Sequence, residues 1–289
     1  MKLKNKNVLI TGGNKGLGFE ICKGFLKEGA NIIFCGRSMH NLQEAFLKLK
    51  KFKTPEQQIY LKKIDISKED QCDELLNFYF NSFDGIDVLV NNAGVIGPKG
   101  KFDQINWNEW KYAIEVNLYG SIYLIYKFLP FLKKNNSGSI IQLSGGGATS
   151  PFPYISAYAA SKCGIVRFIE SLAIELRDYN IKANCIAPGP LNTSMLDEYL
   201  EAGAKNIGLD FYKKVKLQKE RGGAPIEKAV NLAIYLACEE SPFITGKLIS
   251  ALWDDWENID LFLQELSNSD VYTLRRIIAK DRNFNWGDL

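Results

Sequence analysis

The segment Thr11-Gly12-Gly13-Asn14-Lys15-Gly16-Leu17-Gly18 follows an apolar run near the N-terminus and constrains the fold more than any other part of the chain. Glycine allows backbone angles that a Cβ atom would penalise, and it lets the chain pass close to a bound group. The segment is typical of a turn between a strand and a helix, whose first N–H groups can bind an anion. It favours a site for the pyrophosphate of a dinucleotide, although such turns also use glycine for purely structural reasons. The residues expected around the pyrophosphate are Gly12, Asn14, Lys15, Gly16, Leu17 and Gly18.

Strand and helix patterns alternate along the chain, which predicts an α/β fold with a parallel sheet and helices on both faces. The seven expected strands are residues 7–11, 31–35, 59–64, 86–91, 139–144, 181–186 and 247–252. The expected helices are residues 17–27, 40–51, 68–83, 107–133, 158–177 and 226–238. A doubly wound, Rossmann-like sheet of this kind binds ligands beyond the carboxyl ends of its strands. We expect a single such domain over residues 1–252 and one or two extra helices in an extension over residues 253–289.

Composition excludes several classes of protein. The chain has 289 residues, 46% of them hydrophobic, which is enough for a sizeable core. Its formal net charge of +3 comes from residues spread along the sequence, so nucleic acid is not an expected partner. The chain shows no signal region and no apolar stretch of membrane-spanning length, which predicts a cytoplasmic protein without a membrane partner. The widely spaced cysteines suit neither zinc binding nor thiol exchange, and most are expected as reduced core residues: Cys22, Cys35, Cys72, Cys163, Cys185 and Cys238.

Four motifs together resemble the short-chain dehydrogenase/reductase family, from about residue 7 to residue 252. They are Thr11-Gly12-x-x-x-Gly16-x-Gly18, Asn91-Asn92-Ala93-Gly94, Tyr158-x-x-x-Lys162 and Pro188-Gly189-Pro190-Leu191-Asn192-Thr193. The glycine spacing is similar to that of the compact members and differs from that of the extended, epimerase-like members. The resemblance implies an oxidoreductase that transfers a hydride between a nicotinamide and a ketone or secondary alcohol, without a metal ion.

Tyr158 and Lys162 form the expected catalytic pair. Residues four apart on a helix lie on one face, so both side chains can reach a single site. A phenol has a pKa of about 10 in water, and a nearby ammonium group stabilises the phenolate and lowers that pKa. The resemblance implies that Tyr158 gives a proton to a carbonyl oxygen or takes one from an alcohol, while Lys162 also holds the nicotinamide ribose. The alternative for such a pair is a surface tyrosine beside a lysine stem.

Asn117, in Glu115-Val116-Asn117-Leu118, matches the family position that links Lys162 to solvent through water. Asparagine in a helix interior is mildly unfavourable, because its side chain competes for backbone hydrogen bonds. Two interpretations are open. Asn117 is either part of a proton relay or a residue that holds a kinked helical turn.

The sequence departs from the family at the end of the fifth expected strand. Most relatives carry a serine there, thirteen residues before the tyrosine, but this position is Gly145. Ser144 is adjacent, although neighbouring residues of a regular strand point to opposite faces. The run Gly145-Gly146-Gly147 can relax that geometry and turn Ser144 inward, or it can offer backbone N–H groups as donors; Thr149 is a further candidate. Loss of one such donor can slow an enzyme by about a hundred- to a thousandfold.

The expected cofactor is NADP(H). Gly36 stands where an acidic residue would bind the ribose hydroxyls of NAD, and Arg37 follows it. A guanidinium group suits a 2′-phosphate, and Lys15 adds a second positive charge. By resemblance, Asp65 contacts the adenine amino group and Asn92 lies near the adenine ribose. The remaining expected cofactor contacts are Ala93, Gly94, Tyr158, Lys162, Pro188, Gly189 and Thr193.

The substrate is not determined by the sequence. The segment 194–223 mixes apolar residues with lysines and is expected to close over the substrate, and residues 150–154 are expected to shape the opposite wall. An exposed partner-binding surface is the alternative for segment 194–223. A 3-oxoacyl compound, a sugar and a small carbonyl compound all remain candidate substrates. Relatives commonly form homodimers or homotetramers through their long helices, and residues 119–132 are aromatic enough to serve here. The extension is expected to pack on its own subunit or on a neighbour.

Two other functions stay open. The missing serine is compatible with a non-catalytic NADP(H)-binding sensor or scaffold protein. The other is an epimerase or dehydratase that works through a transient ketone.

Overall fold

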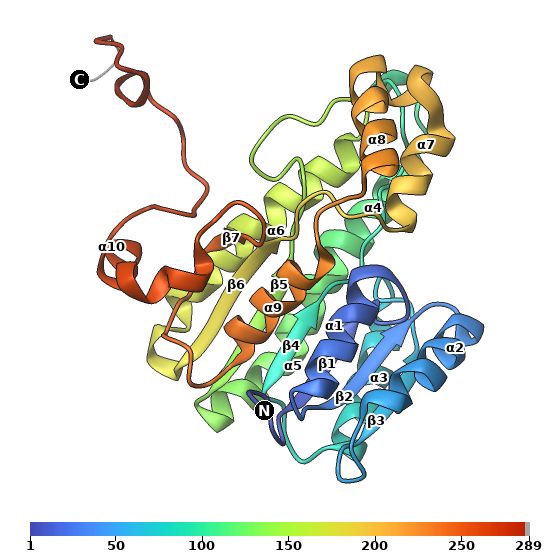
Figure 1. The fold of residues 1–289 in the computed structure, drawn as a ribbon, viewed down its shortest axis with the longest axis vertical. Helices are drawn as coiled ribbons and strands as arrows, with labels where there is room; N and C mark the ends of the chain where they lie inside the picture. Colours follow the sequence, from blue (N-terminus) through green and yellow to red (C-terminus); the bar gives the residue numbers. More distant parts are fainter. Residues whose placement is uncertain (287–289) are drawn as a thin grey trace.

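Seven parallel strands form one sheet with the order β3-β2-β1-β4-β5-β6-β7 in a computed structural model that describes residues 1–286 (Figure 1). The strands are β1 (Asn7–Thr11), β2 (Asn31–Gly36), β3 (Ile59–Lys63), β4 (Val88–Asn91), β5 (Gly138–Leu143), β6 (Ile181–Ala187) and β7 (Leu248–Ser250). All the expected strands are present, with ends that shift by at most two residues. The predicted α/β class and the seven-stranded parallel sheet are confirmed.

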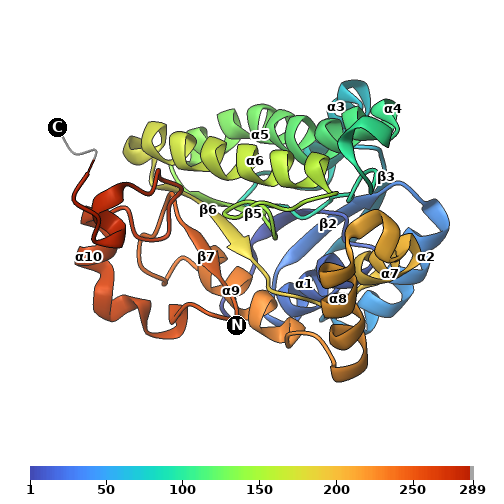
Figure 2. The same ribbon diagram turned by 90° about the horizontal axis from the view of Figure 1, so that it is seen from above.

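Helices cover both faces of the sheet, as Figure 2 shows. One face carries α1 (Gly16–Lys27), α2 (Met39–Leu49) and α9 (Ile226–Ala237), and the other carries α3 (Glu69–Ser82), α5 (Ser121–Asn135) and α6 (Ser156–Glu175). Side chains of a strand alternate between the two cores. In β1, for example, Val8 and Ile10 join the first core and Leu9 joins the second. Because both faces of the central strands are buried, β1, β2 and β4 are mostly apolar.

The strand order reverses between β1 and β4. The chain builds β1, β2 and β3 toward one edge of the sheet and then returns to place β4 on the other side of β1. Crossovers to opposite sides leave a crevice at the carboxyl ends of these two strands, where doubly wound sheets bind their ligands. The glycine turn follows β1 directly at this point.

The expected helix over residues 107–133 is present as an uninterrupted helical run, but it is not regular throughout. It consists of α4 (Trp107–Ile114), a π-helical segment (Glu115–Gly120) that the sequence did not predict, and α5. At Gly120 an added Cβ atom would lie 2.4 Å from the carbonyl oxygen of Ile66, so the helix here passes directly against the loop after β3. Wide turns of this kind inside a helix arise from tertiary contacts, and periodicity does not reveal them.

The segment expected to close over the substrate forms two helices, α7 (Ser194–Ile207) and α8 (Leu209–Arg221). They project beyond the carboxyl ends of the strands (Figure 1, upper right). Glycines with positive φ stand within α7 and at both ends of α8: Gly203 (φ 73°), Gly208 (φ 82°) and Gly222 (φ 88°). We call α7 and α8 together the helical lid.

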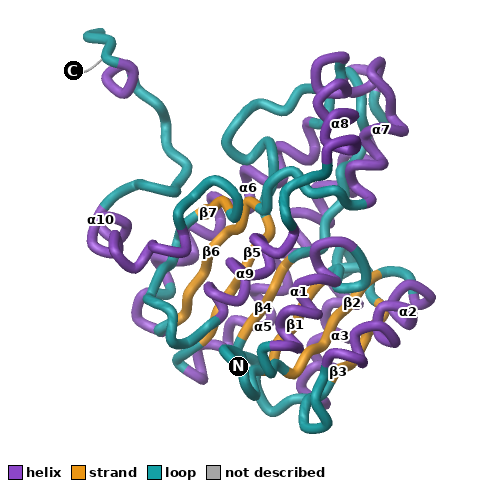
Figure 3. The backbone as a smooth tube through the Cα atoms, in the orientation of Figure 1, coloured by secondary structure: helices purple, strands orange, loops and turns teal. Residues whose placement is uncertain are grey.

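The C-terminal extension packs partly on its own subunit. It contains a 3₁₀ segment (Trp256–Phe262), the short helix α10 (Leu263–Asn268) and a 3₁₀ turn (Ala279–Arg282). Trp256 and Leu266 are buried in the same core as α1 and α9, and the backbone N–H of Leu248 in β7 donates to the carbonyl of Tyr272 at 2.7 Å. Residues 275–286 lead away from the body, largely as a loop that contains the 3₁₀ turn (Figure 3). Residues 287–289 of the expected extension lie outside the described residues.

Two further expectations can be compared with the structure. All six cysteines are free, and all except Cys163 are buried, as expected for core residues. Within residues 1–286, no helix is both long enough and apolar enough to span a bilayer.

Candidate active site

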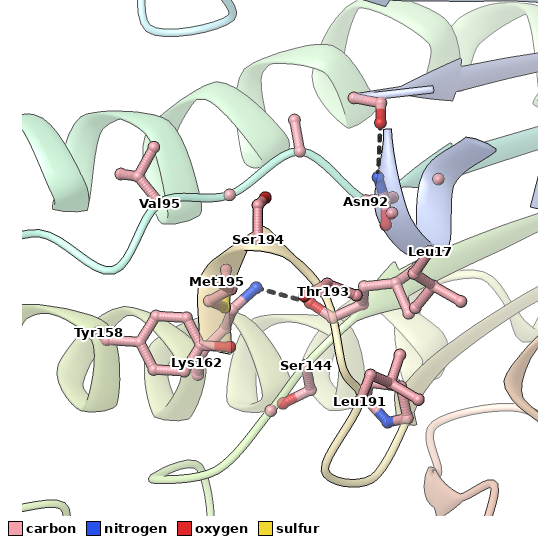
Figure 4. A pocket seen from close by; sticks show the side chains of 18 of the residues that line it. Leu17, Asn92, Val95, Ser144, Tyr158, Lys162, Leu191, Thr193, Ser194 and Met195 are labelled. Atoms are coloured by element: carbon pink, nitrogen blue, oxygen red, sulfur yellow. Dashed lines mark hydrogen bonds between the residues drawn. The ribbon is translucent and has the colours of Figure 1, made fainter. Parts of the chain in front are cut away.

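A cavity of about 530 Å³ opens at the carboxyl ends of the central strands (Figure 4). Its wall includes the glycine turn after β1, the ends of β2, β4, β5 and β6, the start of α6 and the helical lid. All the catalytic and cofactor-binding residues predicted from the sequence line this cavity, except Asn117. They are Gly12, Asn14, Lys15, Gly16, Leu17, Gly18, Arg37, Asp65, Asn92, Ala93, Gly94, Ser144, Tyr158, Lys162, Pro188, Gly189 and Thr193.

The glycine turn is packed so closely that side chains would not fit. A Cβ atom on Gly18 would lie 2.2 Å from the carbonyl oxygen of Gly12 and 2.3 Å from Nδ2 of Asn92. Asn92 uses that nitrogen to donate to the carbonyl oxygens of Thr11 (2.9 Å) and Gly12 (3.1 Å). Gly12 (φ 66°) and Gly16 (φ 55°) adopt the left-handed conformation that favours glycine. The turn therefore has no side chains at these positions that could block the N-terminus of α1, which stays open to a ligand.

Arg37, Tyr112 and Asp65 form a hydrogen-bonded chain at the end of the cavity near β2 and β3. Nη1 of Arg37 donates to the Tyr112 hydroxyl at 2.6 Å, and that hydroxyl donates to Oδ2 of Asp65 at 2.9 Å. The other carboxylate oxygen of Asp65 accepts from the backbone N–H and the hydroxyl of Ser67. Burial opposes ionisation of Asp65, but the hydrogen bonds from Ser67 and Tyr112 outweigh it and lower the pKa of the carboxyl. Arg37 is thus held in place and faces a carboxylate that stays charged.

Tyr158 and Lys162 lie on one face of α6 and are both buried, with 7% and 3% of their surface exposed. The ammonium nitrogen of Lys162 is 5.5 Å from the centre of the Tyr158 ring. It donates a hydrogen bond to the carbonyl of Leu143 at the end of β5 (2.8 Å). The interpretation of this pair as a surface tyrosine beside a lysine stem is therefore wrong.

The expected direction of the Tyr158 pKa is also wrong. Burial raises the pKa of Tyr158 to about 12. The same loss of solvent lowers the pKa of Lys162 to about 8. Desolvation disfavours the charged form of both groups and here exceeds the attraction between them. At neutral pH the phenol therefore carries its proton and Lys162 is mostly charged.

Asn117 does not line the cavity. Its side chain is fully buried in the π-helical segment, where Oδ1 accepts from the backbone N–H of Val95 (2.8 Å) and Nδ2 donates to the carbonyl of Val95 (2.8 Å) and to the Ser161 hydroxyl (3.0 Å). A Cβ atom on Gly94 would lie 3.3 Å from Oδ1 of Asn117 and 3.7 Å from Nζ of Lys162. These bonds support the interpretation that Asn117 holds an irregular turn, while the proton relay stays a hypothesis.

Ser144 and Gly145 follow β5 on the cavity wall. The backbone N–H of Ser144 donates to the carbonyl of Ile186 at 2.8 Å. Its hydroxyl is buried and, within the described residues, has no hydrogen-bond partner. A buried hydroxyl without a partner costs free energy, which makes Ser144 a candidate for a ligand contact.

A hydrophobic cluster separate from the two sheet cores surrounds Tyr158. Its buried members are Ile96, Ile155, Tyr158, Leu196, Tyr199, Ile207 and Val215. Phe152, which precedes α6, and Met195 and Phe211, which belong to the helical lid, pack against it. The predicted wall and lid are thus brought together over the phenol.

Sequence reasoning missed three residues of this region. Tyr112 connects Arg37 to Asp65, Glu198 lines the cavity from α7, and Trp253 lines it from the start of the extension. Neither Tyr112 nor Trp253 belongs to a motif. Glu198 directly precedes Tyr199 in the segment expected to close over the substrate. This position was the one feature of the sequence that could have indicated its place at the cavity.

Comparison with known proteins identifies the family. The sequence model described as "short chain dehydrogenase" matches residues 6–203. The chain belongs to the short-chain dehydrogenase/reductase family. This short-chain dehydrogenase is 34% identical over 250 residues to a 3-oxoacyl-(acyl-carrier-protein) reductase of Chlamydia trachomatis, an alignment that covers 86% of this chain and 96% of the relative. It is therefore an oxidoreductase that acts on CH–OH or C=O groups.

Solved structures show the same fold. An NAD⁺-bound xylitol dehydrogenase superposes with a TM-score of 0.78 at 21% identity, over 86% of this chain and 98% of that one. An actinorhodin polyketide ketoreductase with NADPH has the same TM-score and identity, over 85% and 95% of the two chains. One of these proteins is described with NAD⁺ and the other with NADPH, so the fold does not decide between the two cofactors.

The cavity of this short-chain dehydrogenase fits a nicotinamide dinucleotide, the cofactor of its family. Gly12 and Gly18 pack so closely against Asn92 and Ala93 that the turn has no room for side chains at these two positions. The N-terminus of α1 faces the cavity and suits a pyrophosphate. The unpaired Ser144 hydroxyl, Tyr158 and Lys162 lie farther along the same cavity, where the reacting groups would meet.

Proposed function

We propose that this short-chain dehydrogenase reduces a ketone to a secondary alcohol with NADPH, and that Tyr158 donates the proton. The observation that carries the proposal is the buried phenol, whose pKa of about 12 keeps it protonated at neutral pH on the wall of the cavity. A protonated acid in the resting enzyme suits proton transfer to a carbonyl oxygen. The cofactor, when bound, supplies the hydride.

Lys162 makes this proton transfer easier. The phenolate left on Tyr158 is a buried anion, and the ammonium group 5.5 Å from the ring centre stabilises it. The hydrogen bond to the Leu143 carbonyl fixes the position of that ammonium group. By family resemblance Lys162 also holds the nicotinamide ribose, and Asn117 connects it to solvent.

Ser144 is the proposed second donor to the carbonyl oxygen. Its hydroxyl is buried on the cavity wall and carries no internal hydrogen bond within residues 1–286. A hydroxyl held in place without a partner can donate to developing negative charge without first breaking another bond. Ser144 therefore takes the role that a serine at position 145 has in most relatives.

The preference for NADPH is proposed from the charges at the other end of the cavity. Arg37 is held by Tyr112 at the end of β2, and Lys15 stands in the glycine turn. Two cationic side chains here favour a 2′-phosphate. No carboxylate occupies position 36, where one would bind the ribose hydroxyls of NADH and repel the phosphate.

We further propose that the protein is a cytoplasmic homodimer or homotetramer. Tyr119 (63% exposed) and Tyr126 (69% exposed) lie one after the other along the π-helical segment and α5. Exposed aromatic side chains of this kind are typical of contacts between subunits. Light scattering during size-exclusion chromatography measures the oligomeric state, and the double variant Tyr119→Ser, Tyr126→Ser should shift it toward the monomer.

The experiment that tests the function has two parts. Fluorescence titration should show tighter binding of NADPH than of NADH, and absorbance of the reduced nicotinamide should then fall with a suitable ketone. Tyr158→Phe should retain NADPH binding but lower turnover by about 10²- to 10⁴-fold, the range for loss of a general acid.

Other outcomes would favour the other functions. Turnover that survives Tyr158→Phe contradicts the proposal. Tight NADPH binding without turnover of any carbonyl compound favours the sensor or scaffold. Tightly retained cofactor and a converted substrate without net oxidation favour an epimerase or dehydratase.

A further inference from the structure

The wall of the cavity beyond Tyr158 is aromatic. Phe152, Tyr199 and Phe211 come from the loop before α6, from α7 and from α8, and all three line the cavity. The rings of Phe152 and Phe211 meet edge to face with centres 4.9 Å apart, and those of Tyr199 and Phe211 do so at 5.3 Å. Phe152 also meets the Tyr158 ring edge to face at 6.5 Å. Rings that pack in this way hold one another in place. The wall is thus an ordered apolar surface next to the proton donor.

Aliphatic side chains complete this surface. Met195, Leu196 and Val215 line the cavity from the helical lid and belong to the same hydrophobic cluster. A flat or branched hydrocarbon group placed here would exchange water for apolar contacts on several sides.

Polar groups on this wall are fewer than apolar ones within the described residues. Among the lining residues, Thr149, Ser194 and Tyr199 carry hydroxyl groups and Glu198 carries a carboxylate. The side-chain amide of Gln218 already donates to the carbonyl of Leu191 at 3.2 Å. A sugar would have to give up hydrogen bonds with water for which this wall has too few replacements.

The charges around the cavity are divided between its two ends. Within residues 1–286 the cationic side chains that line it are Lys15, Arg37 and Lys162. Lys15 and Arg37 belong to the glycine turn and the end of β2, and Lys162 donates to the Leu143 carbonyl. On the helical lid the charged lining residue is Glu198; Lys99 is 3.5 Å from its carboxylate but does not line the cavity. An anionic substituent on a substrate would therefore meet apolar rings and a carboxylate that is 45% exposed and paired with Lys99, and no cation lines this end of the described cavity.

We propose that the substrate is a neutral ketone whose carbonyl is attached to an apolar ring or branched hydrocarbon, and that the site rejects carbonyl compounds bearing a carboxylate or phosphate. This inference rests on the proposed ketone reduction, which leaves the substrate class open. The aromatic wall supplies the attraction for the apolar group. Glu198 and the absence of a cation at the lid end of the described cavity supply the rejection, because a buried anion without a partner is strongly unfavourable.

The test compares substrates that carry the same ketone but differ in charge. Methyl acetoacetate and acetoacetate carry the same ketone, as a neutral ester and as an anion. With saturating NADPH, kcat/KM should be at least about 100-fold higher for the ester, since an unpaired buried charge costs several kcal/mol. The bicyclic ketone 2-tetralone should be reduced more efficiently than the ester, and the ketose xylulose should be reduced least efficiently of the neutral compounds.

Variants of the residues that line the cavity test whether they cause the preference for neutral, apolar ketones. Glu198→Gln should narrow the ester-to-acid ratio by about two- to fivefold, because it removes a like charge that is half exposed and paired with Lys99. Phe211→Ala should lower kcat/KM for 2-tetralone by at least about tenfold and for methyl acetoacetate by less, since the larger apolar group loses more contact. Leu209→Ala is the matched control on the same helix, because Leu209 is 57% exposed and does not line the cavity. Leu209→Ala should change neither the ester-to-acid ratio nor the ratio of kcat/KM for 2-tetralone to that for methyl acetoacetate.

Calorimetry separates failure of this inference from failure of the proposed reaction. Binding of 2-tetralone but not of 2-naphthoate to the NADP⁺-loaded protein supports the inference even if no ketone is turned over, an outcome that would overturn only the proposed function. Reduction or binding of the anions at least as good as that of the neutral compounds overturns the inference while the proposed function stands. Efficient turnover of xylulose in preference to 2-tetralone also overturns it.

Discussion

The phenol oxygen of Tyr158 lies against the backbone of Gly145, in the space that a side chain at position 145 would need. A Cβ atom on Gly145 would be 2.3 Å from that oxygen and 3.2 Å from Cζ of the same ring. Such contacts are far below van der Waals distance, and the ring is the end of a side chain packed against Phe152. The glycine and the position of the tyrosine therefore depend on each other, and we propose that the neighbouring Ser144 supplies the hydroxyl that position 145 lacks.

Gly145→Ser should lower activity, although it restores the residue found in most relatives. The added Cβ would push the Tyr158 hydroxyl away from its present position, and displacement of a reacting group by about 1 Å can cost about a hundredfold in rate. We expect kcat for ketone reduction to fall at least tenfold, with NADPH binding retained. Steady-state kinetics and a fluorescence titration measure the two quantities. A rate equal to or above that of the parent protein would show that Tyr158 moves at no cost.

Ser144→Ala should slow the enzyme without destabilising it. Loss of a donor to the carbonyl oxygen should reduce kcat by about 10²- to 10³-fold. The hydroxyl has no partner within residues 1–286, so its removal should leave the free energy of unfolding unchanged or slightly raised. Ser121→Ala is the matched control, because the Ser121 hydroxyl is also buried and unpaired there but does not line the cavity. It should show the same stability with full activity, whereas equal activity of both variants would exclude a role for Ser144.

The rate of ketone reduction should fall as pH rises through about 8. Burial lowers the pKa of Lys162 to about 8, so the side chain is charged below that pH and neutral above it. Tyr158, with a pKa of about 12, keeps its proton throughout this range. Above pH 8 the phenolate formed by proton transfer loses its neighbouring cation, and kcat/KM should decrease while Tyr158 stays protonated. Measurement of kcat/KM from pH 6 to 10 at constant ionic strength tests this decrease. Lys162→Met is the control: it should be slow, and its kcat/KM should not change with pH in this range. A decrease centred near pH 10 would point to another group.

Tyr112→Phe should weaken selection of NADPH. The variant removes the hydroxyl that accepts from Arg37 and donates to Asp65. Arg37 then loses its support, and the KM for NADPH should rise by about tenfold, in line with the loss of a hydrogen bond to a charged group. The KM for NADH should change less, because NADH has no 2′-phosphate. In a protein that already carries Arg37→Ala, Tyr112→Phe should raise the KM for NADPH little further. An equal rise in the KM for NADPH and for NADH would instead indicate that Tyr112 acts on adenine binding, by positioning Asp65.

The sequence by itself determined the architecture and most of the cavity wall. Apolar strands that alternate with amphipathic helices specify a parallel sheet, because both faces of such strands must be covered. The glycine turn and the Tyr158-x-x-x-Lys162 motif are local patterns with fixed places on that sheet, so their residues meet at its carboxyl edge. This is why the predicted residues, apart from Asn117, line one cavity.

Only the tertiary structure decided how these groups behave. Arg37 and Tyr112 are 75 residues apart in the chain, and no local pattern relates them. At the end of the π-helical segment Gly120 packs against the carbonyl of Ile66, a contact between distant parts of the chain that periodicity does not contain. The pKa of Tyr158 rises where the motif predicts a decrease, because the helical lid and the loop before α6 remove solvent from the phenol. Burial is a property of the packed molecule as a whole, and it sets the free energy of a charge more strongly than one neighbouring ammonium group does.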